Sequence, residues 1–236
     1  FGRNGIFYDL DRTNGSYIQS GQYVGKLNWT KGLDPKTGKP LEYDPSKSLQ
    51  VYAEGKISRA GDKATTCPNI QGGTNFFPTG YNPSLGVAYS VGIEGCSDLA
   101  VKQVQPADVH AGQIFQAGTS TNNGVQTGTI NAVDVTTGKM ISTVPTPFPM
   151  YSGVMATPDL LWAGSLDGTF AAYDAKTLEV KWSMNVGTGF QGSPIAFNAG
   201  GKEYIAIVGG GPGLATFNHP ELEKKSAANI LWVFGL

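Results

Sequence analysis

Three segments of this chain share one pattern, and that repeat constrains the fold more than any other feature of the sequence. Residues 5–15, 128–138 and 168–178 each begin with a glycine, continue with strand-forming residues and reach an aspartate six positions later. The aspartates are Asp11, Asp134 and Asp174. Each segment ends four residues after its aspartate and leads into a second short strand-like stretch. Two such stretches joined by a polar turn predict a β-hairpin in each copy.

The turn of each hairpin has a definite chemistry. An aspartate carboxylate can accept backbone N–H bonds across a turn, and glycine supplies the positive φ at which such turns end. The first two copies end in Gly15 and Gly138, but the third ends in Leu178. The third turn is therefore expected to differ or to be mildly strained, because a side chain disfavours positive φ. Similar residues at 34–38 predict a loop turn outside the repeat, and those at 82–86 predict a further hairpin turn.

The spacing of the aspartates indicates a repeat of about forty residues. Asp134 and Asp174 are 40 residues apart, and Asp11 lies 123 residues before Asp134, which is close to three such periods. A period of that length with about four short strands is typical of a β-propeller blade. Two blades in the longer gap are then expected to have lost the pattern or to carry insertions. A β-sandwich with accidental self-similarity is the weaker alternative, because three gapless copies share the aspartate, the turn and the following strand.

Composition and charge exclude several other classes of protein. The 236 residues include 33 glycines and 14 prolines without a Gly-X-Y period, which favours turns between short strands over long helices or collagen. The formal net charge of −1 gives no electrostatic reason to expect nucleic acid as a partner. The sequence contains no run of 18 apolar residues, so no transmembrane helix is predicted. The chain opens at Phe1 within a strand-like stretch, so the missing blades are expected on an N-terminal part, either absent or on a separate or cleaved chain.

The spacing of the cysteines and histidines leaves their roles open. Cys67 and Cys96 lie 29 positions apart and are either unrelated thiols or a disulfide, which implies an oxidising compartment. His110 and His219 share no metal-ligand spacing and are expected to be ordinary surface or loop residues. No C-x-x-C-H motif for covalent haem attachment is present.

The order of short motifs along the chain resembles the quinoprotein alcohol dehydrogenases, which depend on pyrroloquinoline quinone (PQQ). Residues 172–182 are similar to the tryptophan-docking motif of that family, in which Trp182 would lock adjacent blades together. Further similar stretches are R-N-G…L-D-R-T-N-G at 3–15, C-P…G-G-T-N…Y-N-P at 67–83, Y-S-G-V-M-A-T at 151–157, A-G-S-L-D-G at 163–168, G-S-P…G-G-G at 192–211 and N-I-L-W-V-F at 229–234. Their order and spacing together make the resemblance specific.

The resemblance implies an all-β fold, an eight-bladed β-propeller of the quinoprotein type. Residues 1–236 would be the C-terminal part of this single domain and supply roughly half of the ring. PQQ would lie in the central funnel together with Ca²⁺ or a lanthanide. The catalytic aspartate and the metal ligands of the family lie upstream of Arg3, so no metal ligand is expected in this chain.

Three side chains are implied to contact PQQ. Arg3 matches the family arginine that hydrogen-bonds the reactive carbonyl oxygens, where a fixed cation stabilises developing negative charge. Asn75 matches an asparagine whose amide contacts the same region, as both donor and acceptor. Tyr151 stands where many members carry a tryptophan stacked under the ring, and a tyrosine still offers a flat face. Phe76 departs from the usual tryptophan and is expected to reshape the funnel.

Two further pairs follow from the same resemblance. Gly213 and Leu214 align with a Gly-Trp pair that contacts the PQQ carboxylates through backbone N–H groups. Cys67 and Cys96 match the spacing of a structural disulfide of the family, which favours the bonded interpretation of the two cysteines.

The implied function is oxidation of an alcohol, polyol or sugar to an aldehyde or ketone. An upstream aspartate would remove the hydroxyl proton, hydride would pass to PQQ polarised by the metal and Arg3, and electrons would leave to a cytochrome c-type acceptor. The partners are then the N-terminal part of the same enzyme, the substrate and the acceptor, and a homodimer is compatible. A periplasmic location is expected, and residues 31–66 and 97–112 are expected to form a variable rim. The alternative is a non-catalytic propeller scaffold of the outer-membrane assembly type, which binds partner proteins without a cofactor.

Overall fold

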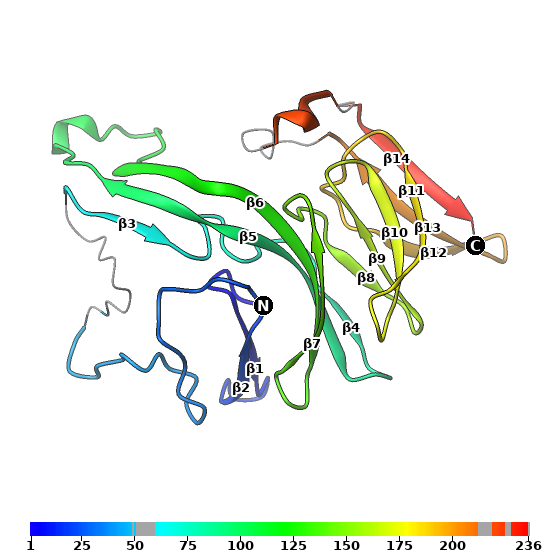
Figure 1. Cartoon of the computed structure of the whole chain (residues 1–236), viewed down its shortest axis with the longest axis horizontal. Coiled ribbons are helices and arrows are strands. Elements are labelled where there is room, and N and C mark those ends of the chain that lie inside the picture. The colour runs from blue at the N-terminus through cyan, green and yellow to red at the C-terminus, as the bar shows by residue number, and fades with distance from the viewer. Residues whose placement is uncertain (49, 51–59, 212–218, 225–227, 236) are drawn as a thin grey trace.

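The chain folds into antiparallel β-structure (Figure 1). The computed structural model describes residues 1–48, 50, 60–211, 219–224 and 228–235. Within these residues there is no α-helix and no helical segment long and apolar enough to cross a membrane. The elements are β1 (Ile6–Leu10), β2 (Tyr17–Gln22), β3 (Lys63–Thr66), β4 (Gly80–Asn82), β5 (Val87–Val101), η1 (Pro106–Asp108), β6 (Gly118–Asp134), β7 (Met140–Thr146), β8 (Val154–Ala156), β9 (Leu160–Gly164), β10 (Thr169–Asp174), β11 (Val180–Asn185), β12 (Ile195–Ala199), β13 (Lys202–Gly209), η3 (Pro220–Lys224) and β14 (Ile230–Gly235).

The strands form sheets that follow one another along the chain. β1 pairs with β2, and the next sheet has the order β3-β5-β6-β7 with β4 also paired to β5. The third sheet has the order β11-β10-β9-β8, and the last has the order β12-β13-β14. Figure 1 shows this progression from the blue hairpin through the green and yellow sheets to the red strand. Successive antiparallel sheets of about four strands are the arrangement expected for propeller blades.

The three predicted hairpins are confirmed as β1–β2, β6–β7 and β10–β11. In each copy the carboxylate of the turn aspartate accepts the backbone N–H of the residue two positions on, at 2.8 Å for Asp11, 2.7 Å for Asp134 and 2.9 Å for Asp174. Each ladder also shifts register shortly before its turn, as a β-bulge does. Hydrogen bonds from the threonine of each turn, the hydroxyls of Thr13 and Thr136 and the N–H of Thr177, are the largest cause that lowers the pKa of the three carboxyl groups. The aspartates are therefore turn residues, as the sequence predicts.

Leu178 closes the third turn with a positive φ of 60°, and it is the one described residue other than glycine in that region. Its N–H still donates to the Asp174 carbonyl oxygen at 2.9 Å, so the turn has the same hydrogen bond as the others. The side chain is only 2% exposed and packs in a core cluster with Tyr89 and Leu161. Burial of the leucine therefore offsets the backbone strain that the sequence predicts.

The prediction of two degenerate blades between the first and second hairpins is wrong for the described residues. The strands described between β2 and β6 are β3, β4 and β5, and all of them belong to the sheet of the second hairpin. The spacing of 123 residues arises from two insertions, one within 23–62 and one in an arm where β5 and β6 remain paired out to Val101 and Gly118. Residue counting cannot distinguish an insertion from a lost blade.

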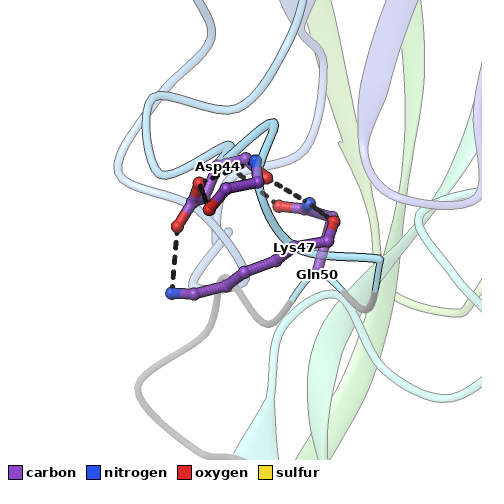
Figure 2. A network of polar contacts seen from close by, with 4 residues as sticks. Asp44, Lys47 and Gln50 are labelled. Atoms are coloured by element: carbon purple, nitrogen blue, oxygen red, sulfur yellow. Dashed lines mark hydrogen bonds and ion pairs between the residues drawn. The ribbon is translucent and has the colours of Figure 1, made fainter.

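Local polar contacts organise the first insertion. The predicted turn at 34–38 is confirmed, because Asp34 accepts the N–H groups of Lys36 and Thr37 next to a bridge between residues 33 and 40. Further along, Gln50 closes a second turn by accepting from the Asp44 N–H at 3.1 Å and donating to the Asp44 carbonyl at 2.7 Å (Figure 2). Lys47 forms an ion pair with the same aspartate at 3.2 Å, and an exposed pair of this kind adds little stability.

The core consists of apolar layers between successive sheets. Phe7 of β1 meets Ala88 and Val133 of β5 and β6, and the predicted hairpin turn at 82–86 is confirmed where β4 joins β5. The next layer lies between β5–β6 and β8–β9, and it contains Val87, Tyr89, Val91, Ile130, Ala132, Val154, Leu161 and Ala163. The last layer lies between β9–β10 and β13, and it contains Trp162, Phe170, Ala172, Ile205 and Ile207. Trp182 contributes across two sheets, because its ring lies 5.6 Å from that of Phe234 on β14.

The strain at Leu178 gives a testable order of stabilities. Leucine-to-alanine substitution in a core costs about 2–5 kcal/mol, and alanine at this position would also retain a backbone conformation that costs about 1–2 kcal/mol. Leu178→Gly should therefore be more stable than Leu178→Ala by about 1 kcal/mol in urea unfolding of the protein. At the equally buried Leu166, which lacks positive φ, glycine should be the less stable variant. If the glycine and alanine variants rank in the same order of stability at both positions, the backbone strain at Leu178 is refuted.

Candidate functional site

The structure brings Arg3 and Asn75 together on one residue, Gln71, and places Tyr151 against the loop that carries it. The Arg3 Nε donates to the Gln71 carbonyl oxygen at 3.0 Å, and the Asn75 Nδ2 donates to the same oxygen at 3.1 Å. The ring of Tyr151 is stacked on that of Phe77, six residues after Gln71 in the same loop. Arg3 precedes β1, Asn75 precedes β4 and Tyr151 precedes β8, so the three groups come from the segments that lead into different sheets.

Residues 67–77, here termed the cysteine loop, are fastened to β5. The disulfide between Cys67 and Cys96 is present, with Cα atoms 4.5 Å apart, which confirms the predicted pairing. Three residues further on, the Ile70 N–H donates to the hydroxyl of the buried Ser97 at 3.0 Å. The loop then turns on Asn69, whose side-chain oxygen accepts the Gln71 N–H at 2.7 Å. The loop position therefore depends on covalent, side-chain and main-chain contacts together.

Two glycines allow the cysteine loop to approach Arg3. The Gly73 N–H donates to the Arg3 carbonyl at 2.8 Å, and the Gly73 carbonyl accepts from the Ile93 N–H at 2.7 Å. A Cβ on Gly72 would lie 2.6 Å from the Arg3 carbonyl oxygen and 2.7 Å from the Arg3 Cβ, and the glycine φ is +91°. Any larger residue would push the two segments apart. The Gly-Gly pair is thus a steric requirement of the site.

The Arg3 guanidinium is held across two carbonyls of the cysteine loop. Its Nη2 donates to the Ile70 carbonyl at 2.8 Å, in addition to the Nε bond to Gln71. These bonds use two of the five N–H groups of a guanidinium, and three are left to bind a ligand. Because the side chain is exposed, a positively charged fork is presented in a fixed orientation.

The donor set near Arg3 is compatible with a carbonyl-rich, anionic ligand such as PQQ. Asn75 uses one amide N–H on Gln71 and accepts the Phe76 N–H at 3.0 Å, which leaves its second N–H. Two buried atoms of the same loop, the Asn69 Nδ2 and the Thr74 Oγ1, have no hydrogen-bond partner within the described residues. Buried polar groups are normally paired, and additional donors at this place suit such a ligand. The residues present therefore fit PQQ in their chemistry.

Tyr151 lies deeper than the resemblance implies. It is 6% exposed and packs with Ile93, Leu166 and Leu222, while the ring of Phe77 is stacked on it at 5.5 Å with 20° between the planes. Burial raises the pKa of Tyr151, and the nearby Gln71 side chain opposes that shift. The ring therefore does not present an open face in this structure, and its role under a cofactor ring stays a prediction. Phe76 is 84% exposed.

Gly213 and Leu214 lie outside the described residues, and their predicted contacts stay predictions. The prediction of surface or loop histidines is confirmed for His110, which is exposed in a loop, whereas His219 lies in a loop before η3 but is 3% exposed. One ring nitrogen lies 2.6 Å from the Gln126 carbonyl oxygen and the other lies 3.0 Å from the Glu221 carboxylate. Leu222 of η3 is buried in the cluster behind Tyr151. The spacing of residues in the sequence did not indicate that His219 and Leu222 would be buried. Among the described residues, no three histidine, cysteine or acidic side chains are grouped as a metal site.

A carboxylate is partly buried next to the residues that follow β2. Glu94 of β5 accepts the Gly25 N–H with both oxygens at 3.0 Å. Burial raises the pKa of Glu94, and the Gly25 bond and Lys26 oppose this shift. The nearby Tyr23 donates to the Gly2 carbonyl at 2.7 Å, and its pKa is raised by burial and by the charge on Glu94. These contacts support the main chain just before Arg3.

Sequence reasoning missed the residues that assemble the site. Gln71, Ser97 and Phe77 hold the loop and Tyr151, but none of them belongs to a family motif. The available signal was position alone, since Gln71 directly precedes the Gly-Gly pair.

Replacing Cys67 and Cys96 with serine should lower the free energy of unfolding by about 3 kcal/mol, because the bond closes a 29-residue separation. Urea unfolding with and without a reductant measures the difference. Reductant should destabilise the unsubstituted protein by a similar amount and leave the double variant unchanged. Two reactive thiols in the folded, unreduced protein would contradict the pairing.

Glu94 should give stability a pH dependence. The pKa of Glu94 in the folded protein lies above its ordinary value of 4.5. The folded state therefore binds the proton more tightly than the unfolded state. The stability that this gives is fully present below pH 4.5 and is lost as pH rises through the folded-state pKa. Glu94→Gln stays neutral and keeps an acceptor for Gly25. The variant should therefore gain stability relative to the unsubstituted protein as pH rises from about 4 to 7. Urea unfolding across this range tests the slope, and a slope of opposite sign would refute the prediction.

Comparisons with known proteins place these features in a family. No protein-family model matches the chain. Over 241 residues it is 30% identical to the quinoprotein alcohol dehydrogenase PedH of Pseudomonas putida, covering 99% of this chain and 39% of that protein. It is also 30% identical over 224 residues to a lanthanide-dependent methanol dehydrogenase of Methylacidiphilum fumariolicum, covering 91% of this chain and 35% of that protein. The chain thus spans less than half the length of these relatives.

Solved structures agree on the fold. A europium-containing methanol dehydrogenase superposes with a TM-score of 0.83 at 24% identity, covering 99% of this chain and 44% of that one. The quinohemoprotein alcohol dehydrogenase from Comamonas testosteroni superposes with a TM-score of 0.77 at 22% identity, covering 99% of this chain and 34% of that one. The predicted all-β propeller fold is confirmed, although the count of eight blades concerns a ring of which this chain is one part. By sequence and by fold, the chain belongs to the quinoprotein alcohol dehydrogenase family.

Proposed function

We propose that the protein containing this chain oxidises an alcohol, polyol or sugar hydroxyl to an aldehyde or ketone with PQQ. The single observation that supports this most strongly is the convergence of Arg3 and Asn75 on Gln71. The two residues are 72 positions apart in the chain, yet their side chains meet on one carbonyl oxygen. Relatives named as alcohol, ethanol and methanol dehydrogenases support the reaction class.

Arg3 and Asn75 would bind the cofactor next to the cysteine loop, where both side chains contact Gln71. When bound, PQQ would supply the oxidising chemistry as the acceptor of a hydride, which is two electrons and one proton, from the alcohol carbon. The three N–H groups of Arg3 not used on the loop would bind ligand oxygens and stabilise negative charge there. The second amide N–H of Asn75 would orient the same ligand. Because both groups are already fixed by carbonyls of the loop, little reorganisation is needed on binding.

The remaining components of the reaction are proposed to come from outside this chain. An aspartate base and the ligands of Ca²⁺ or a lanthanide would belong to the N-terminal part of the enzyme, and Gly213 and Leu214 would add backbone contacts to the cofactor. A cytochrome c-type protein would take the electrons, and the disulfide accords with a periplasmic location. The scaffold alternative is not favoured, since the relatives named above are dehydrogenases.

The test begins with the full-length protein, prepared without cofactor and mixed with PQQ and either Ca²⁺ or a lanthanide. We expect a quinone absorption band that stays with the protein through gel filtration, and reduction of an artificial electron acceptor when an alcohol is added. Full-length protein that takes up no PQQ with either metal would refute the proposal and favour the scaffold.

Arg3→Ala should lower kcat at saturating PQQ about 100-fold, because the fixed cation at the ligand oxygens is lost. Arg3→Lys keeps the charge without the planar fork and should be intermediate. Arg12→Ala, at the exposed turn of the first hairpin, is the matched control and should keep its turnover. Unchanged turnover in Arg3→Ala would show that the assigned role is wrong.

A further inference from the structure

Arg3 lies in a tight turn whose own sequence provides little stiffness. The Gly5 N–H donates to the Gly2 carbonyl at 3.1 Å, so residues 2–5, here termed the arginine turn, close on themselves with Arg3 at the second position. Glycine occupies both ends, Gly5 has a φ of +87°, and glycine restricts the backbone less than any other residue. The direction in which the guanidinium points must therefore be fixed by groups outside the turn.

Tyr23 binds both ends of the arginine turn. Its hydroxyl donates to the Gly2 carbonyl at 2.7 Å, and its N–H donates to the Gly5 carbonyl at 3.0 Å. The side chain is 3% exposed, so water competes little for the hydroxyl. Because the Gly2 carbonyl belongs to the planar peptide that joins Gly2 to Arg3, this hydroxyl fixes the plane from which the arginine begins.

Trp29 binds the same turn on the other side of the arginine. Its indole N–H donates to the Asn4 carbonyl at 2.7 Å. The neighbouring Asn28 donates its N–H to the Cys67 carbonyl at 3.1 Å, and its side-chain oxygen accepts the Cys67 N–H at 2.8 Å. Because Cys67 is covalently bound to Cys96 of β5, the indole is anchored to the part of the chain that also carries the cysteine loop.

The segment that carries Tyr23 is anchored to β5 as well. Gly25 donates its N–H to both carboxylate oxygens of Glu94 at 3.0 Å. The preceding residue of the strand, Ile93, donates its N–H to the Gly73 carbonyl at 2.7 Å, and the Gly73 N–H donates to the arginine turn at 2.8 Å. Adjacent residues of one strand therefore support the arginine turn by two separate routes.

We propose that Tyr23 and Trp29 are positioning residues: their hydroxyl and indole N–H groups fix the arginine turn so that the Arg3 guanidinium faces the cofactor. This inference rests on the function proposed above. Neither residue is required to touch PQQ, because both act through carbonyls on either side of Arg3. The bonds from Arg3 to the cysteine loop orient the far end of its side chain, and the arginine turn orients its base.

The first test uses the full-length protein without cofactor. Tyr23→Phe removes the hydroxyl and Trp29→Phe removes the indole N–H, while each keeps an aromatic ring. Either change should speed backbone hydrogen exchange in residues 2–7 about three- to tenfold, measured by mass spectrometry of the peptide that contains them. Tyr89→Phe, which removes a buried hydroxyl bonded to the Ala175 carbonyl, is the matched control and should leave this exchange unchanged.

The second test adds PQQ, together with Ca²⁺ or a lanthanide, to the same variants. Each change should raise the Kd for PQQ about three- to tenfold, measured by absorbance titration, because the guanidinium no longer meets the ligand at the same angle. In an Arg3→Ala background the same changes should raise the Kd no further, since they act through the guanidinium. A general loss of structure would instead weaken binding in both backgrounds. Tyr89→Phe should leave the Kd unchanged.

The outcomes separate this inference from the proposed function. If the unsubstituted enzyme binds PQQ and both variants bind it equally well, the positioning role is refuted and the proposed function stands. Unchanged hydrogen exchange in both variants refutes the restraint on the turn, and an equally large rise in the Kd in the Arg3→Ala background refutes action through Arg3. Should Tyr23→Phe fold poorly, Trp29→Phe alone still has to meet both tests. An unsubstituted enzyme that binds no PQQ overturns the proposed function, and the role toward the cofactor with it.

Discussion

Burial of apolar side chains between successive sheets is the constraint on which the rest of this structure depends. Each sheet covers one face of the next, so Phe7 meets Val133 across one boundary and Tyr89 meets Leu161 across another. Such layers fix the relative orientation of the sheets, and the segments leading into them are thereby brought near one another. Arg3, Asn75 and Tyr151 occupy three of these segments. Their convergence is a consequence of sheet packing rather than of contacts in sequence.

The sequence predicts those features whose cause is local. The turns at Asp11, Asp134 and Asp174 could be predicted because a carboxylate, a short loop and a residue at positive φ lie within five positions. The pairing of Cys67 with Cys96 and the site residues required the family resemblance, because no local rule joins residues so far apart. The prediction of two lost blades failed because a periodic count does not register insertions.

Features that depend on tertiary packing could not be predicted. Nothing in residues 151–157 indicates that Phe77 would stack on Tyr151, since the contact joins segments that lead into different strands. The burial of His219 depends on the Gln126 carbonyl, 93 residues away in the chain. Gln71 was overlooked for a related reason: much of its contribution comes from a main-chain carbonyl, and every residue type has one. Side-chain chemistry in a sequence does not reveal which carbonyl will be shared.

The arm formed by the outer halves of β5 and β6 has a different consequence. Strands of 15 and 17 residues extend about 50 Å, well beyond the length that the neighbouring sheet can cover. The ladder between them is interrupted between Glu94 and Cys96, and Cys96 carries the disulfide to the cysteine loop. Beyond Ser97 the side chains of the arm lie outside the buried apolar clusters, so substitutions there should cost the fold little. Those at its base would disturb the peptide that orients Arg3.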